Sequence, residues 1–272
     1  MSSCESERNS LTLAQESFDA VKADYDLAAS GLSKAKTDLA ICEGNSGDAM
    51  SVHSIFDMHC RIRNNGGTGS GNIVEETETD YFIETNYHVA GGVGKRNSVD
   101  IWLGGDLKKS GVPAVVVESW FKSTQSVDIA RLRMSKSDVG LSLPVVPYAT
   151  SNDNYEPRTG DHGFFGACAE GLWPRPRSGN ILDVRGGLIY YEPNAIGGDS
   201  GSPVVGIVNG QLRCIGRTAW STRGSSGRWV GLAMTWQRIE QIKRGEVGDY
   251  PLPAETKYPG DLVTQDDQTF GL

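Results

Sequence analysis

The chain has 272 residues, of which 38% are hydrophobic, and it contains 34 glycines and 11 prolines. This length suits one large domain or one medium domain with appendages, and short apolar runs separated by glycine and proline favour an all-β domain. The net charge is −8, with the acidic residues concentrated in residues 1–50 and 246–272. A nucleic-acid-binding surface needs clustered basic residues, so this distribution argues against one.

The first segment, residues 1–45, is predicted to be a helix of the coiled-coil type. Apolar residues recur at alternating spacings of three and four, which is a heptad pattern; they are Leu11, Ala14, Phe18, Val21, Tyr25, Ala28, Leu32, Ala35, Leu39 and Cys42. The pattern has two interpretations: residues 11–42 pair with a second copy or a partner helix, or the helix folds back along its own chain. Residues 46–51 read as a flexible linker.

Short strands bounded by turn residues follow, within a domain predicted to span residues 52–245. This texture is typical of a β-barrel or sandwich. The expected strands are Ser54–Arg63, Gly71–Glu75, Asp80–Thr85, Val99–Leu103, Ala114–Glu118, Ile129–Met134, His162–Ala167, Gly179–Val184, Ser202–Val208, Gln211–Thr218 and Trp229–Met234. A closing helix is expected over Thr235–Arg244, and residues 246–272 read as an extended acidic tail.

Two further features bear on the location of the protein. No run of about 18 apolar residues occurs, so we expect no transmembrane helix and no membrane partner. The polar residues 1–10 lack the basic and apolar regions of a secretory signal. We therefore expect a cytoplasmic protein, or one carried in a virion or phage particle.

The five cysteines form an odd set without paired spacing, which predicts free thiols; they are Cys4, Cys42, Cys60, Cys168 and Cys214. The histidines and cysteines of the predicted domain lack the close spacing of a zinc site, so no metal and no cofactor are expected.

Three segments contain residues suited to acyl transfer. His88 lies in Thr-Asn-Tyr-His-Val-Ala after an apolar strand, Asp128 opens an alternating strand, and Ser200 lies in Gly-Gly-Asp-Ser-Gly-Ser-Pro. A serine hydroxyl needs a neutral imidazole to accept its proton, and a carboxylate orients that imidazole. The oxygen of the tetrahedral intermediate needs backbone N–H donors, here predicted to be the amides of Gly198 and Ser200.

The three motifs, in the order His, Asp, Ser, resemble those of the chymotrypsin-like serine peptidases. Within that clan the chain is most similar to HtrA/Deg-like bacterial peptidases, through Gly67–Gly71, Gly160–Gly166, Cys214–Ala219 and Val230–Met234. The resemblance implies two six-stranded antiparallel β-barrels with the catalytic triad His88, Asp128 and Ser200 between them. It covers about 190 residues, and it implies a protein or peptide substrate.

The resemblance also implies a specificity pocket with Asn194 near its base and Ala219, Trp220, Ser221 and Val230 near its walls. Asn194 is uncharged, so no strong preference for Arg or Lys is expected. The insertion Ser221–Arg228 is a candidate to reshape this pocket. The loop Trp173–Arg177 has two interpretations, a contact to substrate or a plain exposed loop.

The chain departs from the resembling families in two respects. No PDZ domain is expected after residue 245, and no Ile-Val-Gly-Gly-like segment offers an amine to pair with Asp199. Asp199 is therefore expected to support the nucleophile loop locally.

Three functions remain open from the sequence. The first is an active endopeptidase, and the second is a processing protease, viral or phage-borne, that acts on its own precursor or an assembly partner. The third is a structural or binding protein that uses a protease fold as a scaffold.

Overall fold

The computed structural model describes residues 57–64, 67–122, 126–224, 226–246 and 251–261. The predicted helix over residues 1–45 and the linker over residues 46–51 lie outside the described residues. The contacts within the chain separate residues 1–52 from residues 53–272, and every described residue belongs to the second unit. Within the described residues, no helix combines the length and the hydropathy needed to cross a membrane.

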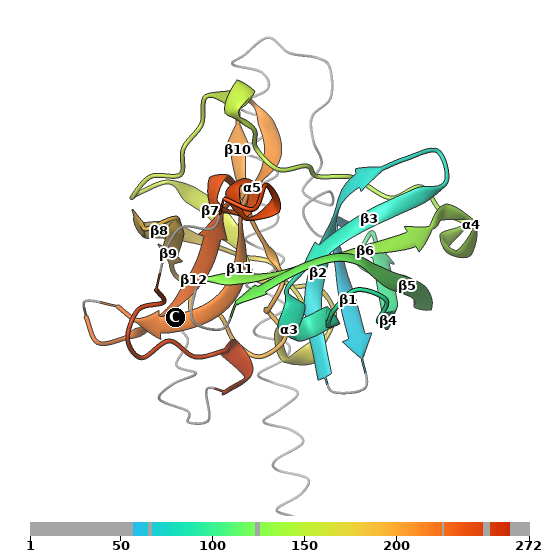
Figure 1. The fold of residues 1–272 in the computed structure, drawn as a ribbon, viewed down its shortest axis with the longest axis horizontal. Coiled ribbons are helices and arrows are strands. Elements are labelled where there is room, and N and C mark those ends of the chain that lie inside the picture. The colour runs from blue at the N-terminus through green and yellow to red at the C-terminus, as the bar shows by residue number, and fades with distance from the viewer. Residues whose placement is uncertain (1–56, 65–66, 123–125, 225, 247–250, 262–272) are drawn as a thin grey trace, which may run out of the picture. The chain divides into compact units, whose positions relative to one another are not determined.

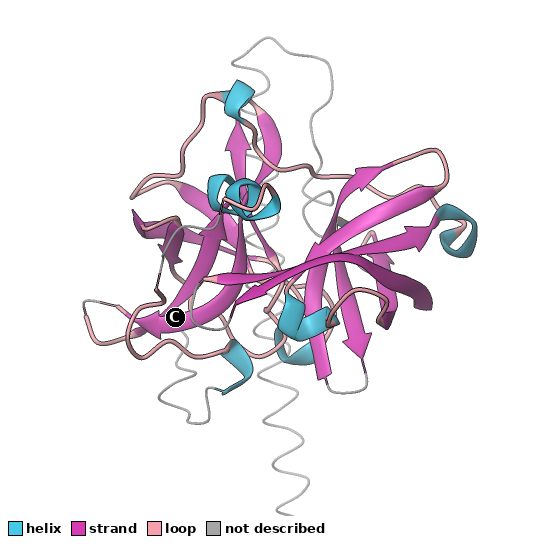
Figure 2. Ribbon diagram, in the orientation of Figure 1, coloured by secondary structure: helices cyan, strands magenta, loops and turns pink. Residues whose placement is uncertain are grey.

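The first half of the described chain forms a closed antiparallel barrel (Figures 1 and 2). Its strands neighbour one another in the order β1-β2-β3-β6-β5-β4. Their bounds are β1 His59–Asn64, β2 Gly67–Glu76, β3 Asp80–Thr85, β4 Arg96–Leu103, β5 Asp106–Lys122 and β6 Val127–Ser135. Two short helices, α3 (Tyr87–Ala90) and α4 (Lys136–Val139), follow β3 and β6.

The second half repeats this architecture in the order β10-β11-β12-β9-β8-β7 (Figure 1). Its strands are β7 His162–Phe165, β8 Arg177–Arg185, β9 Leu188–Tyr191, β10 Pro203–Val208, β11 Gln211–Arg223 and β12 Trp229–Thr235. Helix α5, Trp236–Lys243, closes the domain, and its first turn is capped by Thr235, whose hydroxyl accepts a hydrogen bond from the Arg238 amide at 3.2 Å. Short 3₁₀ turns lie at Ser151–Asp153 (η1), Ala169–Gly171 (η2) and Pro259–Asp261 (η3).

Each barrel encloses a core of branched aliphatic side chains. On β3, Tyr81 and Ile83 are buried, whereas the intervening Phe82 is only half-buried. This period of two places alternate side chains inside the barrel, where Ile83 packs with Ile62 of β1 and Leu132 of β6. Burial of each such side chain contributes about 1.5–3 kcal/mol.

The structure confirms the predicted fold class of two six-stranded antiparallel β-barrels. It corrects several boundaries: β1 begins at His59 instead of residue 54, β7 ends at Phe165, and β5 runs for 17 residues where five were expected. Strand β9 was missed, because its four residues, Leu-Ile-Tyr-Tyr, are all buried and show no alternation. The predicted closing helix is confirmed as α5.

A buried polar network joins the two barrels. Arg217 of β11 is fully buried, and it donates to the carbonyl oxygen of Glu84 at 2.7 Å and to Asn72 Oδ1 at 2.9 Å. Lys243 of α5 donates to the carboxylate of Glu84 at 2.6 Å. Because Glu84 and Asn72 belong to the first barrel, these bonds fix the position of the second barrel against it.

Candidate active site

His88 lies on α3, directly after β3, with its imidazole against a buried carboxylate. Its Nδ1 is 2.5 Å from Asp128 Oδ2, and its backbone N–H donates to Asp128 Oδ1 at 3.0 Å. The side-chain Nδ2 of Asn86 donates to the carbonyl oxygen of Asp128 at 2.8 Å, which ties the start of α3 to β6. Nδ1 therefore carries the proton shared with the carboxylate, and Nε2 is left as the basic nitrogen.

Ser200 lies at the junction of the two barrels. Its carbonyl oxygen accepts a hydrogen bond from the Ser70 amide of β2 at 2.8 Å. The next residue, Gly201, has φ +85°, and a Cβ there would lie 2.1 Å from Thr85 Oγ1 and 2.3 Å from the carbonyl oxygen of Ser70. Only glycine permits this close approach, which brings the serine segment against the chain that leads into His88.

Ser200 is nearly buried, with 6% of the residue exposed. Among the described residues, its hydroxyl makes no hydrogen bond to the imidazole, so the third member of the predicted triad stays a prediction. Catalytic hydrogen bonds are often long in the absence of substrate.

A hydrogen bond to its carbonyl oxygen fixes the orientation of the peptide between Gly197 and Gly198. The Gly197 carbonyl oxygen accepts a hydrogen bond from the Glu170 amide. Since C=O and N–H point in opposite directions across a trans peptide, the Gly198 N–H points away from Glu170. Within the described residues, neither this amide nor that of Ser200 donates to a protein acceptor. Their role as oxyanion donors stays a prediction.

Gly198 itself is required by sterics. Its φ is +91°, and a Cβ there would lie 2.1 Å from the carbonyl oxygen of Cys168. A side chain would therefore force the turn between Ile196 and Asp199 to open, and this turn is closed by a hydrogen bond from the Asp199 amide to the Ile196 carbonyl at 3.0 Å.

Asp199 supports this turn from inside. Its carboxylate is fully buried and accepts hydrogen bonds from the amides of Ile196 at 2.9 Å and Ala167 at 3.1 Å. Its charge is balanced by the guanidinium of Arg177, which also donates to the carbonyl oxygen of Asn194 at 3.0 Å. Local support of the nucleophile loop by Asp199 is thus visible in its contacts.

The role of Arg177 was missed by sequence reasoning. The segment Trp173–Arg177 was expected to contact substrate or to be a plain loop, but Arg177 opens β8 and its side chain turns inward to Asp199. No motif marks this residue, and only its position opposite the nucleophile loop in the barrel shows its role. The neighbouring Arg175 is half-buried and makes a different contact, with its guanidinium over the Trp173 ring at 4.1 Å.

The predicted specificity residues lie on neighbouring segments. Ala219, Trp220 and Ser221 follow one another on β11, and Val230 of β12 lies across from Thr222 in the β11–β12 ladder. The pairing shifts between Thr218 and Trp220, so Ala219 forms a bulge. Ser221 Oγ donates to the carbonyl oxygen of Ala195, next to Asn194, at 3.0 Å. The structure brings these residues together, and their role in substrate selection stays a prediction.

The insertion Ser221–Arg228 does not form a separate loop. Its first residues continue β11 to Arg223, and the Gly224 amide donates to the carbonyl oxygen of Arg228 at 2.8 Å, just before β12 starts at Trp229.

No protein-family model and no curated protein matches this sequence. Many solved structures do match the fold. A serine-to-alanine mutant of Rv3671c from Mycobacterium tuberculosis, in an inactive form, superimposes with a TM-score of 0.50 at 16% identity, over 71% of this chain and 88% of that one. The Rv3671c protease, also in an inactive form, gives 0.51 at 18% identity, over 71% and 91%. The MamO protease domain of Magnetospirillum magneticum gives 0.48 at 19% identity, over 72% and 99%.

Two closed six-stranded barrels in this strand order, superimposable on a serine protease, decide the fold. The chain has the chymotrypsin-like serine protease fold. In this fold the candidate residues His88, Asp128 and Ser200 are contributed by different segments, two from the first barrel and one from the second.

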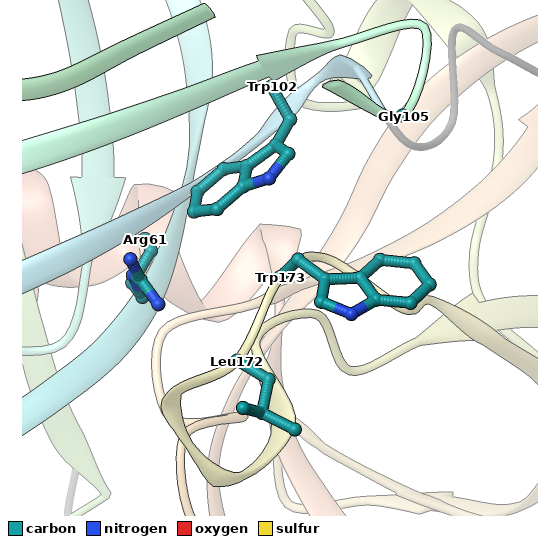
Figure 3. Close-up of a pocket in the computed structure, with 5 residues that line it drawn as sticks. All are labelled: Arg61, Trp102, Gly105, Leu172 and Trp173. Carbon is teal, nitrogen blue, oxygen red and sulfur yellow. The ribbon is translucent and has the colours of Figure 1, made fainter. Parts of the chain in front are cut away.

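A hollow of about 340 Å³ lies beside the candidate site of this protease fold. Arg61 and Trp102 from the first barrel lie on one side of it, and Leu172 and Trp173 from the second half lie on the other (Figure 3). Arg61 donates to the carbonyl oxygen of Gly171 at 2.7 Å, and the Gly171 amide lies against Gly198. Gly171 therefore contacts both Arg61 of the hollow and the candidate oxyanion donor Gly198.

The described cysteines of the protease fold are buried free thiols, Cys60, Cys168 and Cys214. Burial raises the pKa of the Cys168 and Cys214 thiols to about 12, so neither is a nucleophile at neutral pH. Among the described residues, no three His, Cys, Asp or Glu side chains cluster as metal ligands would.

Proposed function

We propose that this protein is a serine endopeptidase that cleaves peptide bonds through an acyl-enzyme on Ser200. The observation that carries the proposal is the contact of His88 Nδ1 with the buried carboxylate of Asp128, at 2.5 Å, beside the segment that holds Ser200. A fully buried carboxylate with two hydrogen bonds to one histidine costs desolvation energy. Activation of a serine explains the arrangement, because the carboxylate orients the imidazole that accepts the serine proton.

The proposed reaction has two stages. Ser200 Oγ attacks the substrate carbonyl carbon while His88 Nε2 takes the hydroxyl proton, and the resulting oxyanion is held by the amides of Gly198 and Ser200. The imidazolium then gives its proton to the leaving amine, and the C–N bond breaks. In the second stage a water molecule gives a proton to Nε2 and attacks the acyl carbon, which returns the serine hydroxyl and releases the carboxylic acid.

Labelling with a fluorophosphonate probe tests the proposal. The full chain is treated with the probe, and the adduct is located by peptide mass. We expect modification at Ser200, its loss in Ser200→Ala, and labelling slowed by about a thousandfold or more in His88→Ala and Asp128→Asn. His162→Ala is the control, because this exposed histidine contacts Asn180 at 3.1 Å and lies outside the candidate triad.

A folded wild-type chain that takes no label at Ser200 would contradict the enzyme proposal. The protease-fold scaffold, the alternative that the sequence left open, would then be favoured.

A further inference from the structure

The chain's own C-terminal segment, residues 254–261, pairs with β11 beside the candidate site. Lys257 and Ser221 form an antiparallel bridge, in which the amide of each donates to the carbonyl oxygen of the other at 2.9 Å. The β10–β11 ladder ends at the pair Pro203 and Arg217, so this edge of β11 is left open at Ser221. An open strand edge binds an extended peptide by such backbone pairs.

The next residue covers the candidate base. The ring of Tyr258 lies on the imidazole of His88, with centroids 4.2 Å apart and planes at 43°. Burial raises the pKa of the Tyr258 hydroxyl, and the nearby carboxylate of Asp128 adds to this effect. The Tyr258 side chain thus lies close to both His88 and the charged carboxylate of Asp128.

The segment then reaches the nucleophile loop. Pro259 is buried, and Gly260 is so near the loop that a Cβ on Gly197 would lie 3.5 Å from its Cα. The Asp261 amide donates to the carbonyl oxygen of Tyr258 at 2.9 Å, which closes a turn. The chain therefore bends away after Tyr258 instead of continuing as a strand across the site.

We infer that residues 254–261 are an intramolecular peptide ligand of the candidate active site, which pairs with Ser221, covers His88 and must leave before another peptide binds. The backbone pair supplies the register, and the aromatic ring fills the space over the imidazole. The consequence for catalysis rests on the proposed function, whereas the occupancy of the site by this segment does not. Once the segment has left, we expect the same edge of β11 to bind peptides that place an aromatic side chain against His88.

Two substitutions at one position isolate the backbone pair in the full chain. Lys257→Pro removes the N–H that donates to Ser221. Lys257→Ala keeps both backbone bonds and removes only the side chain beyond Cβ, whose ammonium group lies 5.2 Å from the Trp229 ring centroid. Tyr258→Ala removes the ring over His88 and serves as an independent variant.

Two measurements compare these variants with wild type: the rate of fluorophosphonate labelling at Ser200 and the hydrogen exchange of the Ser221 amide. We expect Lys257→Pro and Tyr258→Ala to label about tenfold faster than wild type, and Lys257→Ala to label at the wild-type rate. The Ser221 amide should lose its protection in Lys257→Pro and keep it in Lys257→Ala. A synthetic peptide of residues 254–261, added to Lys257→Pro, should slow labelling again, and a scrambled peptide should not.

The outcomes separate the two proposals. If all variants label at the wild-type rate and the Ser221 amide is equally protected, the inference is overturned and the proposed function stands. If no chain labels at Ser200, the proposed function fails, and exchange of the Ser221 amide still decides whether the segment occupies the site. Exchange across the barrel strands shows whether each variant is folded.

Discussion

A single buried carboxylate, Asp199, organises the residues around the candidate nucleophile. It accepts two backbone N–H groups and pairs with Arg177. The positive charge that balances Asp199 is therefore the Arg177 side chain, at the start of β8. A planar guanidinium suits the position, because it bonds Asp199 and the carbonyl of Asn194 together.

We expect Arg177→Ala to slow Ser200 labelling and peptide hydrolysis by about a hundredfold, because the loop that carries the oxyanion donors would shift. The loss should fall on kcat more than on KM, since the donors act on the transition state. Arg177→Lys should restore part of the rate, because it returns the charge without the second bond. Arg175→Ala is the matched control. Equal kinetics for Arg177→Ala and Arg175→Ala would exclude a positioning role for Arg177.

At the scale of the secondary-structure elements, the packing between β9 and β12 leaves no room for an added side chain. Gly231 of β12 pairs with Tyr191 of β9, and the Tyr191 ring stacks on Phe165 at 4.2 Å. A Cβ on Gly231 would lie 2.2 Å from this ring. The ring has no free space to move into, because its hydroxyl is bonded to Thr218 at 2.7 Å.

Gly231→Ala should therefore lower the free energy of unfolding by about 1–3 kcal/mol through overpacking. Urea denaturation measures the change. Gly67→Ala in β2 is the control, since no atom of the described residues lies within 4 Å of the Cβ that it adds. A Gly231→Ala protein as stable as the Gly67→Ala protein would show that the β9–β12 interface is not closely packed.

On the scale of the whole molecule, the two barrels are held by charges that lie between them. Burial by itself raises the pKa of the Glu84 carboxyl, but Lys243 and Arg217 outweigh it, and the pKa falls below its ordinary value of 4.5. Glu84 belongs to the first barrel, whereas both cations come from the second half. The ionised carboxylate is therefore a contact between barrels.

This contact predicts the pH dependence of stability. A folded-state pKa below the unfolded value means that the stabilisation is fully present above pH 4.5 and is lost as the pH falls through the lowered pKa. In Lys243→Met the burial of Glu84 is less compensated, so the pKa of Glu84 should rise toward its unfolded value. This variant should be less stable than wild type at neutral pH and should lose less stability as the pH falls below 4.5. Lys243→Arg should retain the wild-type profile.

Urea denaturation at a series of pH values from neutral to acidic gives both profiles. An equal drop in the free energy of unfolding between neutral and acidic pH for wild type and Lys243→Met would show that Glu84 and Lys243 do not couple the barrels.

The sequence alone determined the fold class, most of the strands and the segments that hold His88, Asp128 and Ser200. These features are local: a period of two marks a half-buried strand, and a nucleophile loop needs its glycines at fixed offsets. Strand β9 escaped because a strand buried along its whole length has no period to detect.

Only the tertiary structure brought Arg177 to Asp199, Lys243 to Glu84 and the C-terminal segment to Ser221 and His88. In the sequence Arg177 and Lys243 are ordinary charged residues, and residues 254–261 are part of an acidic tail. Their roles depend on which groups the closure of two barrels leaves buried or unpaired nearby. Such pairings arise between residues far apart in the chain, where desolvation and geometry decide the partner and local pattern carries no record of it.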